Sequence, residues 1–254
     1  MITDWIRRQF RPSTDQNTDL VSCDIAPAEQ LTAVGDIHGR LDLLQALLPR
    51  LNDQRPLVFV GDYIDRGPYS AQVLRQLHHL SKTSEGRVQC LLGNHEEMLL
   101  RFVDDPQRYI NLWFHNGGLQ TLASFGIPLP SETEISEHGP ELAKQLRRAM
   151  GKDLLTWLAD LPLTWTSGNV ALVHAALDPR QPLNEQSRQI CLWGHPMFPR
   201  LSRCDTQWVV HGHTIVNRPR IRNRVVSIDT GAFASGRLTA VEIQSGSVRF
   251  LSTV

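Results

Sequence analysis

The sequence predicts an α/β fold around one hydrophobic core, and three observations support this prediction. Short β-type runs alternate with helical patterns through the first hundred residues, as expected of βαβ units. Later strand-like runs follow one another with no long helix between them, which favours a mixed sheet or two packed sheets with a more antiparallel second half. The chain has 254 residues, of which 41% are hydrophobic, and this is enough for a single sizeable core.

Three units in the first hundred residues repeat one pattern, in which a strand is followed by a glycine and then by polar residues. The expected strands lie at 31–34, 57–60 and 88–92, and the motifs GDIHGR, GDYIDRG and GNHEEM follow them. Amphipathic helices separate the strands, and the second of these helices begins near Ser70. Ligands bind at the carboxyl ends of the strands in open α/β sheets, so these loops mark a candidate site.

The rest of the chain divides into a helical stretch and a β-rich half. Residues 97–165 contain helical segments with polar breaks, and we expect a helical insertion beside the site. Strand-like runs then resume with NVALV, QWVV, VVSI, LTAVEI and SVRFL. We expect a single domain over 30–254 and a leader over 1–29. The apolar spacing of the leader predicts a short helix and a polar linker rather than a membrane anchor.

The composition argues against nucleic acid and membrane partners. Lys and Arg total 26 and Asp and Glu total 26, so the chain has no net field that would attract a polyanion. No apolar run is long enough to cross a bilayer, and the start lacks the apolar core of a signal peptide. The four cysteines form no CxxC pair, which argues against a zinc ribbon or a disulfide framework. We therefore expect a cytoplasmic protein, and we expect a monomer.

Residues of metal-binding types follow the predicted strands in both halves of the chain. They are Asp36, His38, Asp62, Asp65, Asn94, His95, His174, His211 and His213. Each alone has an ordinary explanation as a turn or core residue, but together at one sheet edge they indicate a metal site. The set lacks cysteine, which disfavours a structural zinc site, and it holds more ligands than one ion needs. We therefore expect two metals about 3.5–4 Å apart that share a carboxylate.

The motifs GDIHG, GDYIDRG, GNHE, a later HA and a later GHT, in this order, resemble those of the metal-dependent phosphoesterase superfamily. Within it they are most similar to the calcineurin-like PPP family of serine/threonine protein phosphatases, in its bacterial and phage branch. The similarity runs from about Gly35 to Ala234. It implies a metallophosphoesterase β-sandwich of two mixed sheets flanked by helices (α/β/β/α). It also implies two divalent ions, for which we expect Mn²⁺, with iron or zinc as alternatives.

The resemblance implies six metal ligands. The first metal would be held by Asp36, His38 and Asp62. The carboxylate of Asp62 would bridge to the second metal, whose other ligands would be Asn94, His174 and His213.

The resemblance also implies three catalytic roles. His95 would be the general acid that protonates the leaving group, Asp65 would orient it, and Arg66 would hold the phosphate. A carboxylate beside an imidazole favours the protonated ring, which can donate near neutral pH. The guanidinium of an arginine offers a rigid fork for phosphate oxygens.

One position departs from the family pattern. Leu92 stands where these phosphatases commonly carry an arginine that clamps the phosphate. Arg200 and the cluster at 218–224 are the candidate replacements, although a solvated strand edge is the simpler explanation of the cluster. The arginines of this cluster are Arg218, Arg220, Arg222 and Arg224.

Further residues have weaker indications. The stretch Trp113–Gly126 resembles a loop near the substrate, and Asp229 and Thr230 resemble residues that brace the site from behind. We expect His211 to support or line the site without binding metal. The remaining histidines considered, which we expect to be surface or structural residues, are His78, His79, His138 and His195.

The resemblance favours a phosphoprotein phosphatase. It would hydrolyse phosphoserine or phosphothreonine monoesters of a phosphoprotein or phosphopeptide, with phosphotyrosine as an open extension, by direct attack of a hydroxide that bridges the metals. The alternative is a symmetrical dinucleoside polyphosphate hydrolase, since those enzymes share the motifs and often have an apolar residue at the position of Leu92. They typically read GDxxARG, so Asp65 favours the phosphatase, and Glu96 of GNHE favours it too.

Two other functions fit the sequence less well. A catalytically silent scaffold of this family would have lost metal ligands, and every expected ligand is present. A cyclic nucleotide phosphodiesterase typically has a second histidine after the GH motif, where this chain has Thr214 and Ile215.

Overall fold

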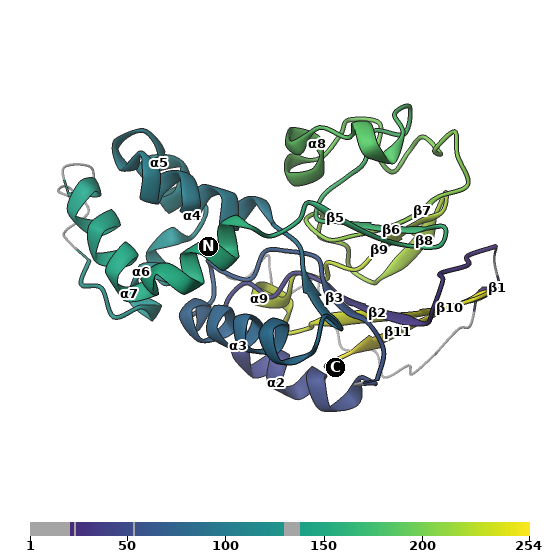
Figure 1. Ribbon diagram of the computed structural model, residues 1–254, viewed down its shortest axis with the longest axis horizontal. Helices are drawn as coiled ribbons and strands as arrows, with labels where there is room; N and C mark the ends of the chain where they lie inside the picture. The colour runs from purple at the N-terminus through teal and green to yellow at the C-terminus, as the bar shows by residue number, and fades with distance from the viewer. Residues whose placement is uncertain (1–20, 23, 53, 130–137) are drawn as a thin grey trace, which may run out of the picture.

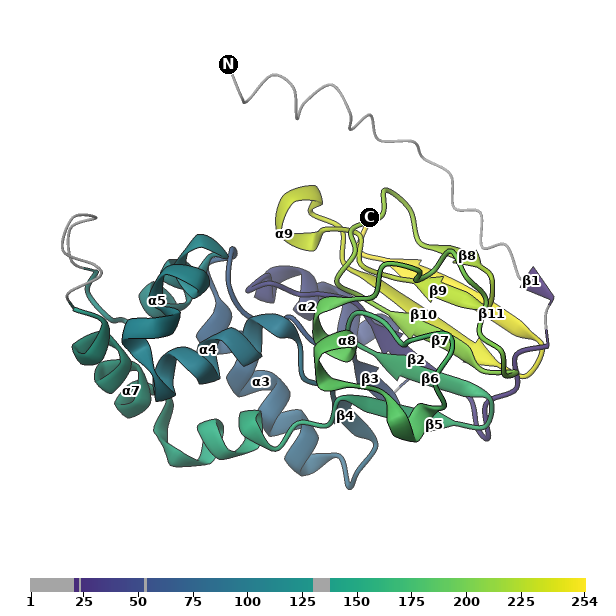
Figure 2. The same ribbon diagram turned by 90° about the horizontal axis from the view of Figure 1, so that it is seen from above.

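The computed structural model describes residues 21–22, 24–52, 54–129 and 138–254. Two sheets lie one above the other, and a group of helices extends to one side (Figure 1). The view from above shows the same separation, with the helices at one end and the strands at the other (Figure 2). The expected α/β fold with two mixed sheets and flanking helices is confirmed.

The first sheet has six strands, with parallel and antiparallel halves. In spatial order they are β1 (Val21–Ser22), β11 (Ser247–Ser252), β10 (Thr239–Gln244), β2 (Leu31–Val34), β3 (Leu57–Phe59) and β4 (Val88–Cys90). β2, β3 and β4 are parallel, whereas β10 is antiparallel to both β2 and β11. The parallel strands are the three that precede the glycine motifs, so all three motifs lie at one end of the sheet.

The second sheet has five strands. In spatial order they are β5 (Thr164–Ser167), β6 (Val170–Val173), β7 (Trp208–His211), β9 (Val225–Ser227) and β8 (Arg220–Arg222). The expected more antiparallel second half of the chain is confirmed, because β5 pairs antiparallel with β6, β8 with β9, and β10 with both β2 and β11. The centre of the second sheet differs, since β6, β7 and β9 are parallel. Loops and one short helix make the crossover from β6 to β7, so the sequence contains no long helix there.

Helices lie against the sheets and beside them (Figure 1). Before β5 the chain forms α2 (Leu41–Leu47), the 3₁₀ turn η1 (Leu48–Arg50), α3 (Ser70–Thr83), α4 (Asn94–Asp104), α5 (Pro106–His115), α6 (Gly118–Ser124) and α7 (Gly139–Ala159), of which α4 to α7 make up the group at the side. Later in the chain come η2 (Leu183–Glu185), α8 (Arg188–Trp193) and α9 (Ala232–Ser235). Helices α4 to α7 follow one another between β4 and β5, where the sequence predicts a helical insertion. Helix α7 is kinked at Gly151, whose φ is 74°.

Alternation along the strands builds the layers. In β2, Leu31 and Ala33 pack between the two sheets, whereas Val34 packs towards the helices. In β6, Val170 and Leu172 pack between the sheets, and Val173 packs with Cys191 of α8 on the outer face. Successive strand residues point to opposite faces, and a strand that is buried on both faces becomes a continuous apolar run. This explains why VALV is a continuous apolar run and why Thr32, the polar residue of LTAV, is buried as well.

The leader expected over 1–29 is partly built into the first sheet. Val21 pairs with Val248, and Ile25 is buried between the sheets. The expected helix near the start of the chain lies outside the described residues. Among the helices that the structure describes, none combines the length and the apolar character that crossing a bilayer requires.

Candidate active site

Six parallel strands direct their carboxyl ends to one place. They are β2, β3 and β4 of the first sheet and β6, β7 and β9 of the second. The expected site residues follow these strands within a few positions. Contacts between the sheets bring them together, since His174 of the second sheet lies 3.3 Å from Asp62 of the first.

Asp62 lies at the centre of the site. Its Oδ2 is 3.5 Å from Nε2 of His38 and 3.8 Å from Nε2 of His95, and its Oδ1 is 3.3 Å from Nε2 of His174. Two groups of three potential ligand atoms, each group within 4.8 Å, share this carboxylate. One group adds His38 and His95, and the other adds His174 and His213. A shared carboxylate between imidazoles is the donor set that a pair of divalent cations requires.

Asn94 and Asp36 complete the cluster. Oδ1 of Asn94 lies 2.8 Å from Nε2 of His174 and 2.9 Å from Nδ1 of His213. The carboxylate of Asp36 accepts a hydrogen bond from the backbone N–H of His213, at 2.9 Å to Oδ2. All six side chains that the sequence suggests as ligands therefore lie at one site, although Asp36 contacts His213 rather than His38.

Backbone carbonyls orient two of the histidines. Nδ1 of His38 lies 2.7 Å from the carbonyl of Ile64, and Nδ1 of His174 lies 3.0 Å from the carbonyl of Val60. A carbonyl accepts, so Nδ1 carries the proton and Nε2 keeps its lone pair towards Asp62. Burial lowers the pKa of His38 to about 3 and that of His174 to about 4. Both rings are thus neutral, which is the form that binds metals.

Electrostatics within the cluster favour bound cations. Burial opposes ionisation of Asp62, but four histidines outweigh it and hold the pKa of Asp62 well below its ordinary value. Burial raises the pKa of Asp36 well above its usual range, and the neighbouring carboxylates of Asp229 and Asp62 raise it further. Several carboxylates this close together in a buried place repel one another unless positive charge is added.

The loops that carry the site are held in strained conformations. Five of its residues have a positive φ, and they are His38 (45°), Asp62 (55°), Asp65 (70°), Arg66 (67°) and His213 (61°). Each such conformation costs about 1–3 kcal/mol, and side chains in this state gather at functional sites because the surroundings enforce them. The strain explains why both Asp62 and Asp65, three residues apart, turn into the site.

Glu96 enforces this loop, and sequence reasoning missed its role. Its buried carboxylate accepts hydrogen bonds from the backbone N–H groups of Asp62 (2.9 Å), Tyr63 (2.8 Å) and Gly93 (3.0 Å). The bond to Gly93 is half of a capping box at the start of α4. The spacing of Gly93 and Glu96 in GNHE could have indicated the box, but not the bonds to the loop after β3.

His95 and Asp65 form a buried pair. Nδ1 of His95 lies 2.7 Å from Oδ2 of Asp65. The indole N–H of Trp113 and the hydroxyl of Thr121 donate to the same carboxylate, at 3.0 and 2.6 Å. Burial lowers the pKa of His95, but Asp62 and Asp65 outweigh it and raise that pKa above its ordinary value. The stretch Trp113–Gly126 therefore contacts the site through Asp65.

Arg66 faces the cluster from its open side and is partly exposed. Its two terminal nitrogens lie 3.0 Å from Nε2 of His38 and 3.2 Å from Nε2 of His95. The guanidinium carbon lies 4.6 Å from the ring centroid of Phe233 in α9. Phe233 belongs to the stretch DTGAFASG, in which the sequence analysis considered only Asp229 and Thr230. Two forked donors over a cationic site can hold a phosphate.

Several other candidates lie elsewhere. Leu92 is fully buried in the core beside the helices. Arg220 and Arg222 are exposed on the edge strand β8, as the simpler explanation expected, and Arg224 pairs with Asp24 at 2.6 Å. Both ring nitrogens of His211 are engaged away from the cluster, with the carbonyl of Gly212 and the hydroxyl of Ser227.

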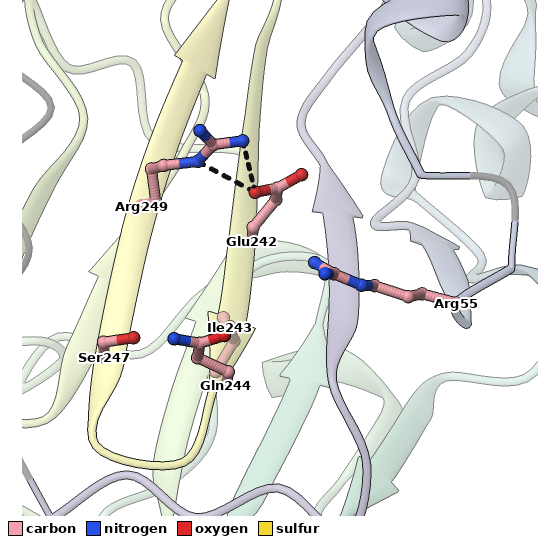
Figure 3. A pocket seen from close by; sticks show the side chains of 6 residues that line it. All are labelled: Arg55, Glu242, Ile243, Gln244, Ser247 and Arg249. Carbon is pink, nitrogen blue, oxygen red and sulfur yellow. Dashed lines mark hydrogen bonds and ion pairs between the residues drawn. The ribbon is translucent and has the colours of Figure 1, made fainter.

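Two of the hollows on the described surface differ in their position relative to the site. The first, of about 240 Å³, is lined by residues of β10, β11 and the segment before β3 (Figure 3). Ile243 pairs with Leu31, which places this hollow at the amino ends of the parallel strands, opposite the site. The second, of about 410 Å³, has His213 in its wall. His195, expected to be a surface or structural residue, also lines it.

The fold and the cluster define a class of protein, the dinuclear metal-dependent phosphoester hydrolases. The chain belongs to the calcineurin-like phosphoesterase family, whose model matches residues 30–217. It is 30% identical, over 81% of its length and 86% of the relative, to the asymmetrical bis(5′-nucleosyl)-tetraphosphatase PrpE of Bacillus velezensis. Further bacterial relatives carry the same name.

Solved structures support the fold. A crystal structure of a candidate diadenosine tetraphosphatase aligns with a TM-score of 0.62 at 22% identity, over 91% of this chain and 98% of the other. A cold-active protein-tyrosine phosphatase from a Shewanella species aligns with a TM-score of 0.56 at 18% identity, over 95% and 89% of the two chains. Because nucleotide and protein phosphatases share this architecture, the fold alone does not identify a substrate.

The expected protein phosphatase activity, with a phosphoprotein as partner, is wrong. The relatives that cover most of the chain are named for bis(5′-nucleosyl) tetraphosphates. The motif comparison that favoured a phosphatase depended on Asp65 and Glu96, and both side chains are buried supports of the site. The carboxylate of Asp65 contacts His95, Trp113 and Thr121, and that of Glu96 holds a backbone loop.

Proposed function

We propose that this chain hydrolyses bis(5′-nucleosyl) tetraphosphates asymmetrically, to a nucleoside triphosphate and a nucleoside monophosphate. The observation that carries the proposal is the similarity to asymmetrical bis(5′-nucleosyl)-tetraphosphatases over 81% of the chain. The cluster around Asp62 supports it, because such a site suits the cleavage of phosphoric anhydrides. The sequence analysis named a symmetrical enzyme as its alternative, and the relatives favour the asymmetrical reaction instead.

We assign six residues as metal ligands. They are Asp36, His38, Asp62, Asn94, His174 and His213. Asp62 is the proposed bridge, since it alone belongs to both ligand groups found among the described residues. Two divalent ions held there, for which we propose Mn²⁺, would supply Lewis acidity and an activated water. Imidazole ligands suit Mn²⁺ better than Mg²⁺, which prefers oxygen and water.

Arg66 and His95 would act on the phosphate chain, and Asp65 would act through His95. The two terminal nitrogens of Arg66 point towards the cluster and would bind phosphate oxygens there. Asp65 fixes the ring of His95, so that Nε2 faces the reacting phosphate and can donate to the departing oxygen. The departing group is a nucleotide phosphate, which needs less protonation than an alkoxide.

Product analysis tests the proposal. The Mn²⁺-loaded protein is incubated with diadenosine tetraphosphate, and nucleotides are separated by anion-exchange chromatography. Equal amounts of ATP and AMP are expected, whereas two molecules of ADP for each substrate would show symmetrical cleavage. An Asp62→Asn variant serves as the control for contaminating hydrolases. Turnover of a phosphopeptide with no turnover of the dinucleotide would refute the proposal.

We further propose that the protein works in the cytoplasm. Cys90, Cys191 and Cys204 are free thiols, and Cys204 is exposed. Exposed free thiols persist in reducing compartments. Fractionation of cells that express the tagged chain tests this, and recovery in a secreted fraction would contradict it.

A further inference from the structure

A hollow of about 410 Å³ opens beside the proposed metal ligand His213. Its wall continues from His213 to Ala175, at the end of β6, and then to the segment 193–198 after α8. The volume of the hollow falls within the range of about 300–1,000 Å³ that ligand sites occupy, and it is more than one phosphate requires.

Part of the wall is built from rings. Trp193 and Phe198 line it together with Pro196. The lining residues in the described part of the chain include no Lys, Arg, Asp or Glu. The polar groups are the imidazoles of His195 and His213 and the hydroxyl of Thr214. Such a surface suits a flat, uncharged, aromatic group with hydrogen-bonding edges, and it does not suit an anion or an acidic peptide.

Contacts behind the wall hold these rings in place. The indole N–H of Trp193 donates a 2.8 Å hydrogen bond to the buried carboxylate of Glu97 in α4, which also accepts from Arg188 at 2.9 Å. The polar end of Trp193 is therefore occupied, and its ring is left for apolar contact. Phe198 packs edge-on against the buried ring of His211, with centroids 4.9 Å apart. Both rings are thus positioned without a ligand.

We propose that this hollow binds one nucleobase of the substrate, with Trp193 and Phe198 as stacking surfaces. The phosphate chain of that nucleoside would then run past His213 to the cluster around Asp62. His195 also lines the hollow; its Nδ1 accepts a 3.3 Å hydrogen bond from the backbone N–H of Met197, and its Nε2 lies 3.9 Å from Oδ2 of Asp178. This inference rests on the proposed function, because it concerns the nucleoside part of the same substrate.

The inference is tested with two substrates, only one of which carries a nucleobase. Diadenosine tetraphosphate carries adenines, whereas inorganic tripolyphosphate offers an anhydride chain without any. We expect Phe198→Ala to lower the ratio of kcat/KM for the dinucleotide to that for tripolyphosphate by about 5- to 100-fold, as for the loss of one base stack worth about 1–3 kcal/mol. Phe198→Leu keeps the apolar volume without an aromatic face, so it should also lower the ratio. This variant serves as the test if Phe198→Ala folds poorly.

The control is Met197→Ala. Met197 is 40% exposed, lies in the same segment and does not line the hollow, so both activities should stay at the wild-type level.

A second measurement compares the inhibition constants of AMP and of inorganic phosphate, with p-nitrophenyl phosphate as the substrate. We expect AMP to bind more tightly than phosphate to the wild type, and Phe198→Leu to remove most of that advantage.

The outcomes separate the two proposals. If the wild type cleaves the dinucleotide but both Phe198 variants keep the wild-type ratio, the base site is wrong and the proposed function stands. If the wild type does not cleave the dinucleotide, the proposed function fails, and the AMP measurement then decides the base site. Equal inhibition of the wild type by AMP and by phosphate would overturn the proposed base site.

Discussion

Nδ1 of His95 lies 2.7 Å from Oδ2 of Asp65, and both side chains are almost completely buried. The hydrogen bond fixes the ring, so that Nε2 faces the carboxylate of Asp62 at 3.8 Å. The same Asp65 oxygens accept from Trp113 and Thr121, which prevents the carboxylate from rotating. The pair therefore directs one imidazole nitrogen towards the cluster around Asp62, and the proposed role of His95 suggests a test that depends on the leaving group.

Replacing His95 should slow substrates with poor leaving groups most. We expect His95→Asn to lower kcat on phenyl phosphate by about 10²–10⁴-fold, the usual contribution of general acid catalysis. The loss on p-nitrophenyl phosphate should be smaller, because nitrophenolate leaves with little protonation. Steady-state kinetics on both substrates, with metal content measured in parallel, check this. Equal losses on the two would show that His95 acts on the metals or the phosphate instead.

Removing the charge of Asp62 should deplete both metal positions at once. Because Asp62 belongs to both ligand groups, we expect Asp62→Asn to lose more bound Mn²⁺ than His174→Ala, which affects one group. Elemental analysis after gel filtration measures this. Asp42→Asn, at an exposed aspartate paired with Arg40, is the control and should retain the metal of the wild type.

Chelation should abolish activity and Mn²⁺ should restore it. Full activity in excess chelator would contradict the two-metal assignment.

A methyl group at position 93 should disrupt the site without opening the core. A Cβ on Gly93 would clash with the backbone nitrogen of Asp62 and with its Oδ1, because it would lie closer to both than real contacts allow. We expect Gly93→Ala to abolish dinucleotide hydrolysis and to reduce metal content. Gly139→Ala is the matched control, since its nearest neighbour would be the end of the Ile110 side chain at 3.3 Å. Wild-type activity in Gly93→Ala would mean that the loop can shift freely.

Glu97 should stabilise the fold in a pH-dependent way. Burial raises its pKa, but hydrogen bonds from Trp193 and Arg188 and the charge of Arg101 outweigh it and hold the pKa below its ordinary value of 4.5. A carboxylate whose pKa is lower in the folded than in the unfolded state stabilises the fold at any pH above its unfolded pKa. This contribution to the free energy of unfolding is lost as the pH falls through the folded pKa. We expect Glu97→Gln to cost about 1–2 kcal/mol at pH 7, as for a charge-assisted hydrogen bond.

Thermal denaturation at several pH values checks this prediction. The difference in Tm between the wild type and Glu97→Gln should be about 2–6 °C at pH 7 and should shrink as pH falls below about 4. Glu141→Gln is the control, because its side chain is half exposed and its contact with Lys144 at 3.8 Å should contribute little. A difference that stays constant down to low pH would assign the effect to packing rather than charge.

The sequence by itself determined the strands that carry the site and the order of the motifs on them. Gly35, Gly61 and Gly93 each follow an apolar run and open a polar loop, and local backbone preferences decide such patterns. The carboxyl ends of parallel strands share one edge, so convergence of Asp36, Asp62 and Asn94 could be predicted without coordinates. The parallel pairing of β6, β7 and β9 could not be predicted in this way, because a crossover without a long helix leaves no periodic signal.

Only the tertiary structure decided which side chains support the site and which surround the substrate. Glu96 holds a loop 34 residues earlier in the chain, and Glu97 fixes Trp193, 96 residues later. No local pattern predicts such pairs, because a carboxylate selects its donors only after α4 and α8 have packed. The substrate was misjudged because Asp65 in GDYIDRG was taken to distinguish phosphatases from dinucleotide hydrolases, which typically read GDxxARG. In the folded chain the carboxylate of Asp65 is fully buried and accepts from His95, Trp113 and Thr121, so it does not itself contact a substrate.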